Sequence, residues 1–250
     1  MNPAGTRTVV RFLIPAWAEP TARPAQAMVR WDAMAAGIGD EATWACVRSQ
    51  VTASGLVLVS SGPDDGPALQ ALLPPMGRQL AERYGGCSIS VQHEPVSAEV
   101  TPDRLWAYRI NRYAASKPGK GDKAWKAEQE QPTGEPREAW EARTAERVTA
   151  TLHREAAEWG IDLPAEGSLL TVIDAGRPMP IPGLKDGLMV MARLGMLVAG
   201  HVRLDGLWAG GSLARLGFGW LERTHVAREL GAASARRLAA RLPDDQEHMA

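Results

Sequence analysis

The chain has 250 residues, of which 45% are hydrophobic and 23% are charged, and its formal net charge is −1. This is the composition of an ordinary globular protein, and the length allows one large domain or two of roughly 100 residues each. No apolar run approaches the roughly 18 residues of a membrane-spanning helix, and the only two cysteines, Cys46 and Cys87, lack metal-binding spacing.

The N-terminal part alternates apolar strands with helices. We expect strands at Thr8–Pro15, Gly55–Ser60, Cys87–Val91 and Arg104–Tyr113, and helices at Ala25–Ala36 and Pro67–Tyr84, the second helix interrupted or begun late at Pro74–Pro75. One more strand is expected between Thr43 and Val51 to complete this set. Elements in this order form a βαββαβ unit, which is the ferredoxin-like arrangement. We therefore assign residues 1–113 to an N-terminal ferredoxin-like domain.

Residues 114–165 are predicted to be an insertion made of a basic loop and a helix. The helix runs from Arg137 to Gly160 and has a partial apolar stripe. Three arginines lie near one of its faces, at Arg143, Arg147 and Arg154. Either these arginines pair with Glu146 and Glu155 on a solvated surface, or they form a helix face that grips an RNA stem.

Residues 166–250 form the remaining part of the chain. Strands are expected at Leu169–Asp174 and Leu188–Leu204, with a loop rich in Pro and Gly between them, and a helix from about Val226 to Arg241 ends the ordered chain. Charge is unevenly distributed despite the neutral sum. Residues 104–126 hold seven Lys or Arg and one acid, and residues 201–241 hold seven Arg and three acids. These local basic segments fit an anionic partner.

A glycine-rich stretch lies between the last strands. Gly210 and Gly211 are followed, after five residues, by Gly217-Phe218-Gly219 and an apolar Trp-Leu pair. Glycines permit positive φ and close backbone approach, so with Arg215 the stretch can present N–H groups and a cation to a phosphate chain. The structural alternative is a β-hairpin loop with bulges. The stretch lacks the G-x-x-x-x-G-K-[S/T] pattern of a nucleotide-binding P-loop.

This spacing resembles the glycine-rich loop of the CRISPR precursor-RNA processing endoribonucleases of the RAMP superfamily. Ala209 stands where the family loop usually begins with a glycine, and the apolar strand Met196–Leu204 precedes the loop as it does in the family. The segment Tyr108–Arg112, with alternating arginines, resembles a family strand as well. The resemblance covers about a fifth of the chain, and the terminal helix suggests the type IV branch.

The resemblance implies an α+β fold of two ferredoxin-like (RRM-like) halves, here with an inserted helical segment and a C-terminal helix. The implied activity is cleavage of repeat RNA at the base of its hairpin without metal or cofactor. In that reaction a 2′-hydroxyl attacks the phosphorus and leaves a cyclic phosphate. The implied partners are CRISPR repeat RNA, which the enzyme retains, and other subunits of an effector complex. We expect no membrane association and a cytoplasmic location.

The resemblance places active residues around the first strand–helix connector and the first helix, often with a histidine, but this chain has no histidine before His93. Arg23 and then Arg30 are the catalytic candidates there, and Arg241 on the last helix is the third. Arginine stays charged at working pH, so it is a poor general base but suits a negatively charged phosphorane. The structural alternative is that Arg30 only pairs with an acid on the helix surface.

The candidate RNA-binding residues are the basic side chains and glycines of these segments: Arg109, Arg112, Lys117, Lys120, Lys123, Arg143, Arg147, Arg154, Gly211, Arg215, Gly217, Gly219, Arg236 and Arg237. Of the nine tryptophans, Trp208 and Trp220 flank the glycine stretch and could stack a base. Two other functions stay open. The first is a non-catalytic RNA-binding RAMP subunit, which the missing N-terminal histidine supports. The second is an unrelated α/β enzyme or structural protein.

Overall fold

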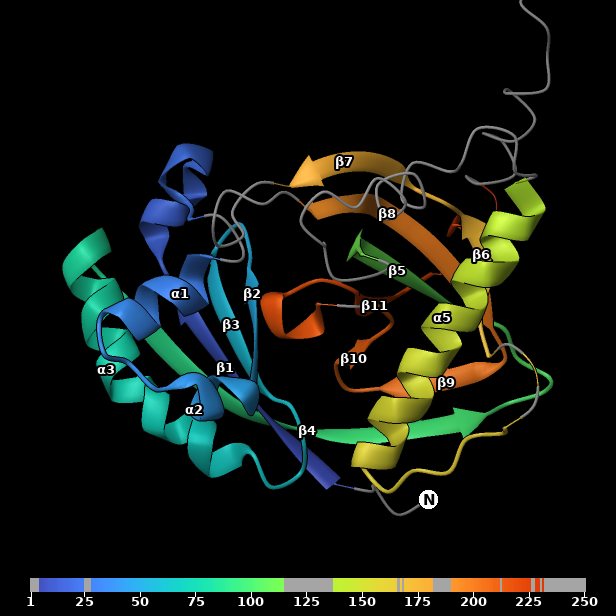
Figure 1. The fold of residues 1–250 in the computed structure, drawn as a ribbon, viewed down its shortest axis with the longest axis horizontal. Coiled ribbons are helices and arrows are strands. Elements are labelled where there is room, and N and C mark those ends of the chain that lie inside the picture. Colours follow the sequence, from blue (N-terminus) through green and yellow to red (C-terminus); the bar gives the residue numbers. More distant parts are fainter. Residues whose placement is uncertain are drawn as a thin grey trace, which may run out of the picture.

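The structure is a computed structural model of the chain. It describes residues 5–24, 28–114, 137–165, 167, 169–181, 190–211, 213–225, 228, 229 and 231. The strands form two antiparallel sheets. Helices α1, α2 and α3 cover the first sheet, and α5 covers the second (Figure 1). The fold is α+β with antiparallel sheets, as the sequence predicts. Within the described residues, no helix combines the length and apolar character needed to span a membrane.

The first sheet is built from the N-terminal elements. They are β1 (Gly5–Leu13), η1 (Pro15–Ala18), η2 (Pro20–Ala22), α1 (Met28–Ala35), α2 (Glu41–Ala45), β2 (Val47–Val51), β3 (Gly55–Ser60), α3 (Gly66–Tyr84) and β4 (Ser88–Val100). The strand order is β2-β3-β1-β4-β9, so β3 separates β1 from β2 and β1 separates β3 from β4. This is the split βαβ arrangement. The additional strand expected between Thr43 and Val51 is confirmed as β2.

Helix α3 runs without a break through Pro74 and Pro75. The predicted interruption or late start at these prolines is therefore wrong. A proline inside a helix costs about 3 kcal/mol locally. The helix buries Leu69, Leu72 and Met76, together with Leu80, against the first sheet, and burial of each such side chain stabilises the fold by roughly 1.5–3 kcal/mol. Tertiary packing thus outweighs the local cost.

The second sheet and the helix that covers it come from the elements that follow β4. These elements are β5 (Trp106–Tyr113), α5 (Arg137–Glu158), β6 (Thr171–Asp174), β7 (Arg177–Ile181), β8 (Val190–Gly200), β9 (Val202–Asp205), β10 (Trp208–Ala209), η4 (Ala214–Leu216) and β11 (Trp220–Thr224). Their strands form the second sheet except for β9, which pairs with β4 in the first. The order is β10-β11-β5-β8-β6, with β7 also paired to β8. Within it, β11-β5-β8-β6 repeats the pattern β4-β1-β3-β2 of the first sheet. The glycine-rich stretch and short strands occupy the place of the second crossover helix.

The strand predicted at Arg104–Tyr113 belongs to this second sheet, where β5 pairs with β8 and β11. Its assignment to the first half is corrected, because β4 already fills the fourth position beside β1 along Gly5–Leu13. The far end of β4, Ser97–Val100, pairs with β9 and so links the two sheets. Most of the predicted terminal helix Val226–Arg241 lies outside the described residues.

Helix α5 contributes buried side chains to the core of the second half. The predicted apolar stripe is confirmed, since Trp140, Val148, Leu152 and Trp159 are all buried against the sheet. A separate small cluster of Val9, Val59 and Trp220 packs across the two halves of the molecule. The polar face of α5 and the glycine-rich stretch border the space between the halves.

Candidate functional site

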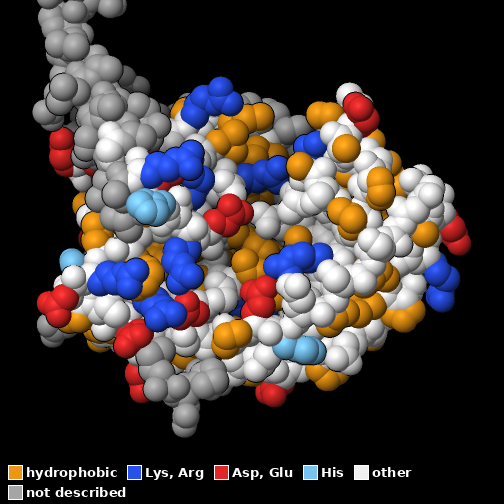
Figure 2. Space-filling model, turned by 180° about the vertical axis from the view of Figure 1, so that it is seen from behind, with side chains coloured by type: hydrophobic (Ala, Val, Ile, Leu, Met, Phe, Trp, Pro, Cys, Tyr) orange, Lys and Arg blue, Asp and Glu red, His pale blue; other side chains and the backbone are white. Residues whose placement is uncertain are grey.

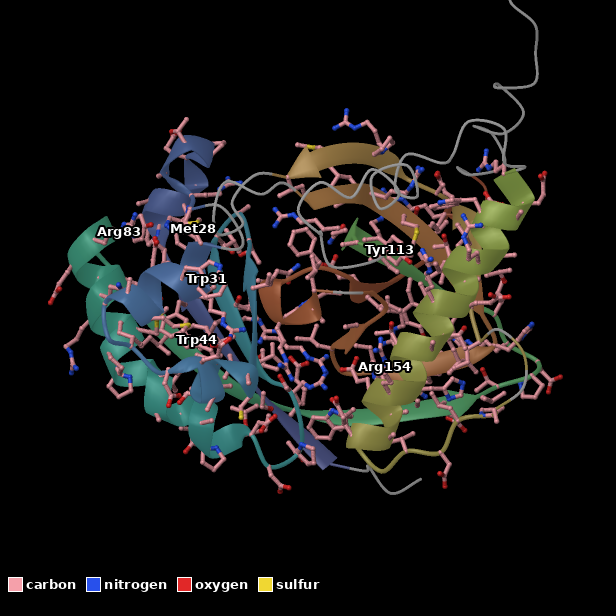
Figure 3. The ribbon with its side chains drawn as sticks, viewed as in Figure 1. Met28, Trp31, Trp44, Arg83, Tyr113 and Arg154 are labelled. Atoms are coloured by element: carbon pink, nitrogen blue, oxygen red, sulfur yellow. The ribbon has the colours of Figure 1, made fainter. Side chains whose placement is uncertain are left out.

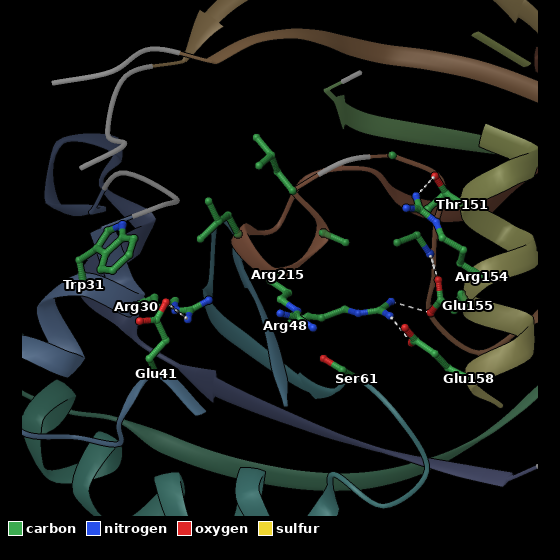
Figure 4. A pocket seen from close by; sticks show the side chains of 15 residues that line it. Arg30, Trp31, Glu41, Arg48, Ser61, Thr151, Arg154, Glu155, Glu158 and Arg215 are labelled. Atoms are coloured by element: carbon green, nitrogen blue, oxygen red, sulfur yellow. Dashed lines mark hydrogen bonds and ion pairs between the residues drawn. The ribbon is translucent and has the colours of Figure 1, made fainter. Parts of the chain in front are cut away.

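A cleft of about 500 Å³ lies between the two halves (Figure 4). One wall comes from α1, α2 and β2, and the other from α5 and the glycine-rich stretch. Its charged lining residues are Arg30, Arg48, Arg154, Arg215, Glu41, Glu155 and Glu158. On the face seen in Figure 2, basic and acidic side chains both occur, several of them close together.

The glycine-rich stretch closes on itself and on β5. The N–H of Gly210 donates to the carbonyl of Gly219 at 2.7 Å, and the N–H of Gly219 donates to the carbonyl of Arg112 at 2.8 Å. Gly219 has φ +75°, and a Cβ there would lie 2.8 Å from the nitrogen of Gly211. The stretch joins β10 to β11, so the β-hairpin interpretation of the glycines is correct. It also forms one wall of the cleft through Gly211 and Arg215.

Arg30 and Arg215 approach the cleft from opposite halves. Arg30 is only 8% exposed, and its Nη2 lies 3.9 Å from a carboxylate oxygen of Glu41. Burial lowers the pKa of Arg30, Glu41 raises it, and the positive charge of Arg215 lowers it further. The Nε of Arg30 is buried and has no hydrogen-bond partner among the described residues. Two guanidiniums that repel each other across a cleft favour an anion between them.

Arg48 is held by a buried ionic cluster at the base of the cleft. Glu155 Oε1 accepts from Arg7 at 2.8 Å and from Arg48 at 2.6 Å, and its Oε2 accepts from the N–H of Ala209 at 2.8 Å. Arg48 also lies 3.5 Å from Glu158. Glu155 thus joins β1 and β2 of the first half to β10 beside the glycine-rich stretch. The alternative in which Glu155 pairs with arginines of its own helix on a solvated surface is therefore wrong for this residue.

Of the three candidate arginines on α5, one lines the cleft. Arg154 lines it, and its Nη2 donates to Thr151 Oγ1 at 3.2 Å. Figure 3 shows Arg154 and Trp31 on the two sides of the gap between the halves. Arg143 and Arg147 lie eleven and seven residues earlier, near the same face of the helix, and both are half-buried.

Among the described residues, the predicted site residues Arg23, Arg109 and Arg112 do not line the cleft. Arg23 is not among its lining residues, and its guanidinium donates to the carbonyls of Trp17 at 2.5 Å and Ala18 at 3.0 Å, which holds the turn before α1. Arg109 pairs with Glu229 at 2.5 Å, and burial lowers the pKa of Arg112. Six predicted residues lie outside the described part of the chain: Lys117, Lys120, Lys123, Arg236, Arg237 and Arg241.

The tryptophans predicted to stack bases are buried. Trp208 is 1% exposed in the second core and donates to the carbonyl of Asp205, and Trp220 packs between the two halves. Sequence reasoning missed Trp31, which lines the cleft. It also missed Arg48, because a strand arginine gives no local sign of its partners. The signal for Trp31 was its position beside Arg30, off the apolar face formed by Val29 and Ala33.

Comparison with known proteins identifies the fold. No family model and no curated protein matches the sequence. Solved structures do match, and the chain has the fold of the Cas6-type CRISPR RNA endonucleases. Csf5, a type IV CRISPR-Cas Cas6 crRNA endonuclease, is 18% identical with a TM-score of 0.59. Two Cas6b structures, one described as a CRISPR RNA processing endoribonuclease, are 9% and 10% identical with TM-scores of 0.54 and 0.55. Each match covers 88% of this chain and 100% of the other.

Proposed function

We propose that the chain is a metal-independent endoribonuclease that cleaves precursor CRISPR RNA within the repeat, at the base of its hairpin. The observation that supports this most is the meeting of Arg30 and Arg215 from opposite halves in one cleft, in a fold shared with Cas6 endonucleases. The repeated strand order supports two ferredoxin-like halves. The likeness to Csf5 favours the type IV branch.

The proposed reaction is attack by a 2′-hydroxyl on the adjacent phosphorus. The bond from phosphorus to the 5′-oxygen breaks, and the products are a 2′,3′-cyclic phosphate and a 5′-hydroxyl. The protein must hold the attacking and leaving oxygens in line and stabilise charge on the phosphorane. Arg30 and Arg215 supply that charge, and the buried Nε of Arg30 offers a donor with no partner among the described residues. Arginine does not act as the general base.

Arg23 and Arg241 stay catalytic predictions. In this structure the guanidinium of Arg23 is occupied by two backbone carbonyls. Direct contact of those donors with a phosphate would require these bonds to break, so we rank Arg30 before Arg23. Arg241 lies outside the described residues.

The remaining basic residues are proposed to hold the RNA beyond the cleft. Arg154 extends the basic lining along α5, and Arg143 and Arg147 continue the same face toward its start. The segment 104–126 and the last helix would contact the stem backbone, where sequence-independent phosphate contacts predominate. We propose that the product is retained for an effector complex, which predicts nearly single-turnover kinetics.

The test is cleavage of an end-labelled repeat hairpin in EDTA, with binding measured on the same samples. Wild type is expected to cut, and Arg30→Ala to bind but to cut at least about 100-fold more slowly, as for loss of one preorganised charge stabiliser. Arg78→Ala is the control, since Arg78 is exposed on α3 and does not line the cleft. Arg23→Ala tests the other candidate in parallel.

Three results would contradict parts of the proposal. Binding without cleavage by wild type would indicate a non-catalytic RNA-binding subunit. Absence of salt-dependent binding to structured RNA would indicate an unrelated protein. Cleavage that needs a divalent metal, or that tolerates a 2′-deoxy nucleotide at the cut, would contradict the chemistry.

A further inference from the structure

Trp31 differs from the other tryptophans that the structure describes. Those others are all between 0% and 8% exposed: Trp17, Trp44, Trp106, Trp140, Trp159, Trp208 and Trp220. Trp31 is half-buried. It also belongs to none of the apolar clusters that the described residues form, although its helix neighbours Val29 and Ala33 are in the first core.

Trp31 is among the residues that line the cleft. Trp31 is the one aromatic side chain among the described residues that line it. Figure 4 shows Trp31 and Arg30 on the α1 side and Arg215 on the glycine-rich stretch between α1 and α5. The guanidinium carbon of Arg30 lies 5.6 Å from the Trp31 ring centroid. An aromatic surface thus stands next to the cations that suit a phosphate.

This pairing of groups matches one repeating unit of RNA. A nucleotide presents the apolar face of its base, with an anionic phosphate on the same or the adjacent nucleotide. Indole rings stack on bases of any identity because every base has a π-face, and arginines bind the phosphate oxygens. The cleft volume of about 500 Å³ falls in the range in which small-ligand sites occur, roughly 300–1,000 Å³. Leu213 and Leu216 add apolar lining from the glycine-rich stretch.

We propose that Trp31 forms the base-binding part of a nucleotide subsite, stacking on the base next to the phosphate that Arg30 and Arg215 hold. This deepens the proposed endonuclease function and rests on it for the identity of the RNA. Trp31 is a positioning residue in this scheme. Stacking fixes the nucleotide so that its 2′-oxygen, phosphorus and 5′-oxygen can align. Because stacking tolerates any base, the subsite selects an unpaired nucleotide rather than a sequence.

The test is a cycle of protein and RNA changes. Repeat hairpins carry a single abasic nucleotide, moved one position at a time through the unpaired residues beside the stem. The affinities of wild type, Trp31→Phe and Trp31→Ala are measured on RNA made non-cleavable by 2′-deoxy substitution. Single-turnover cleavage is measured on the matching unmodified RNA. Thermal unfolding of each variant is recorded, so that a loss of RNA affinity can be separated from a loss of folded protein.

For wild type, one abasic position should weaken binding by about 5- to 150-fold, the usual effect of losing one stacked base. Trp31→Ala should cause a similar loss of affinity on intact RNA. When Trp31→Ala is combined with RNA that is abasic at that position, the affinity should fall by less than about twofold beyond the effect of either change alone. Trp31→Phe should restore most of the affinity. Losses that multiply at every position, or unchanged binding by Trp31→Ala, would overturn the subsite. Tight RNA binding with this pattern but no cleavage would instead refute the endonuclease function.

Discussion

Glu155 joins the two halves beside the cleft from a buried position, and its removal is expected to cost most of the stability of the fold. Glu155→Ala would leave the guanidinium of Arg7, which is 0% exposed, and that of Arg48, which is 9% exposed, without their shared partner. Breaking a buried ion pair costs about 3–5 kcal/mol. The N–H of Ala209 would also lose its acceptor, at about 1–3 kcal/mol.

These losses share one network, so they do not simply add, and we expect roughly 4–7 kcal/mol in total. A domain of ordinary stability has about 5–15 kcal/mol available. Glu155→Ala should therefore unfold at far lower urea concentration than wild type. Glu155→Gln keeps the side-chain volume and one acceptor oxygen but loses the charge. Its free energy of unfolding should therefore lie between those of wild type and Glu155→Ala.

The assay is urea unfolding of wild type, Glu155→Ala, Glu155→Gln and Glu158→Ala. Glu158 is the matched control because it pairs with the same Arg48 at 3.5 Å, yet its side chain is 54% exposed. Its removal should cost no more than about 1 kcal/mol. A loss below 1 kcal/mol for Glu155→Ala, or equal losses for the two alanine variants, would refute the reasoning that burial makes this cluster critical.

Three other changes test separate parts of the structure. Burial raises the pKa of Tyr108 to about 12. The stability that protonated Tyr108 gives to the folded protein is therefore complete below the ordinary pKa near 10 and is lost as pH rises through 12. In urea unfolding, the difference in free energy of unfolding between wild type and Tyr108→Phe should change in favour of the variant by up to about 2–3 kcal/mol between pH 9 and 12. Gly219→Ala should destabilise more than Gly85→Ala by thermal unfolding, since both have φ near +75° but only at Gly219 would the new Cβ meet backbone; equal losses would contradict the close packing. Arg215→Ala should leave stability within about 0.5 kcal/mol and reduce the slope of log RNA affinity against log salt by about 1; an unchanged slope would remove Arg215 from the RNA path.

Local pattern predicted most elements but not their membership in a sheet. The alternating residues of Trp106–Tyr113 indicate a strand, and the structure has one there. Nothing in those residues says whether the strand closes the first sheet or begins the second. That depends on β4, whose pairing with β1 and then β9 is set by contacts distant in sequence.

The lining of the cleft was predictable where glycine spacing and helix position determine it. The glycine-rich stretch, Arg30, Arg154 and Arg215 all line the cleft. Burial was not predictable from residue type, which explains two errors. Trp208 is in the core while Trp31 faces the cleft, and Glu155 pairs with Arg7 and Arg48 rather than with its own helix. For Glu155 the deciding partners come from the other half of the chain.

The central claim is that arginines from both halves act together on one phosphate. The most direct measurement is single-turnover cleavage of a repeat hairpin in EDTA by wild type, Arg30→Ala, Arg215→Ala and the double variant. The account predicts a cut ending in a 2′,3′-cyclic phosphate, large losses for each single variant, and a double loss smaller than their product, because the residues share the phosphate. Unimpaired cleavage by both single variants, or no cleavage by wild type under any condition that permits binding, would contradict it.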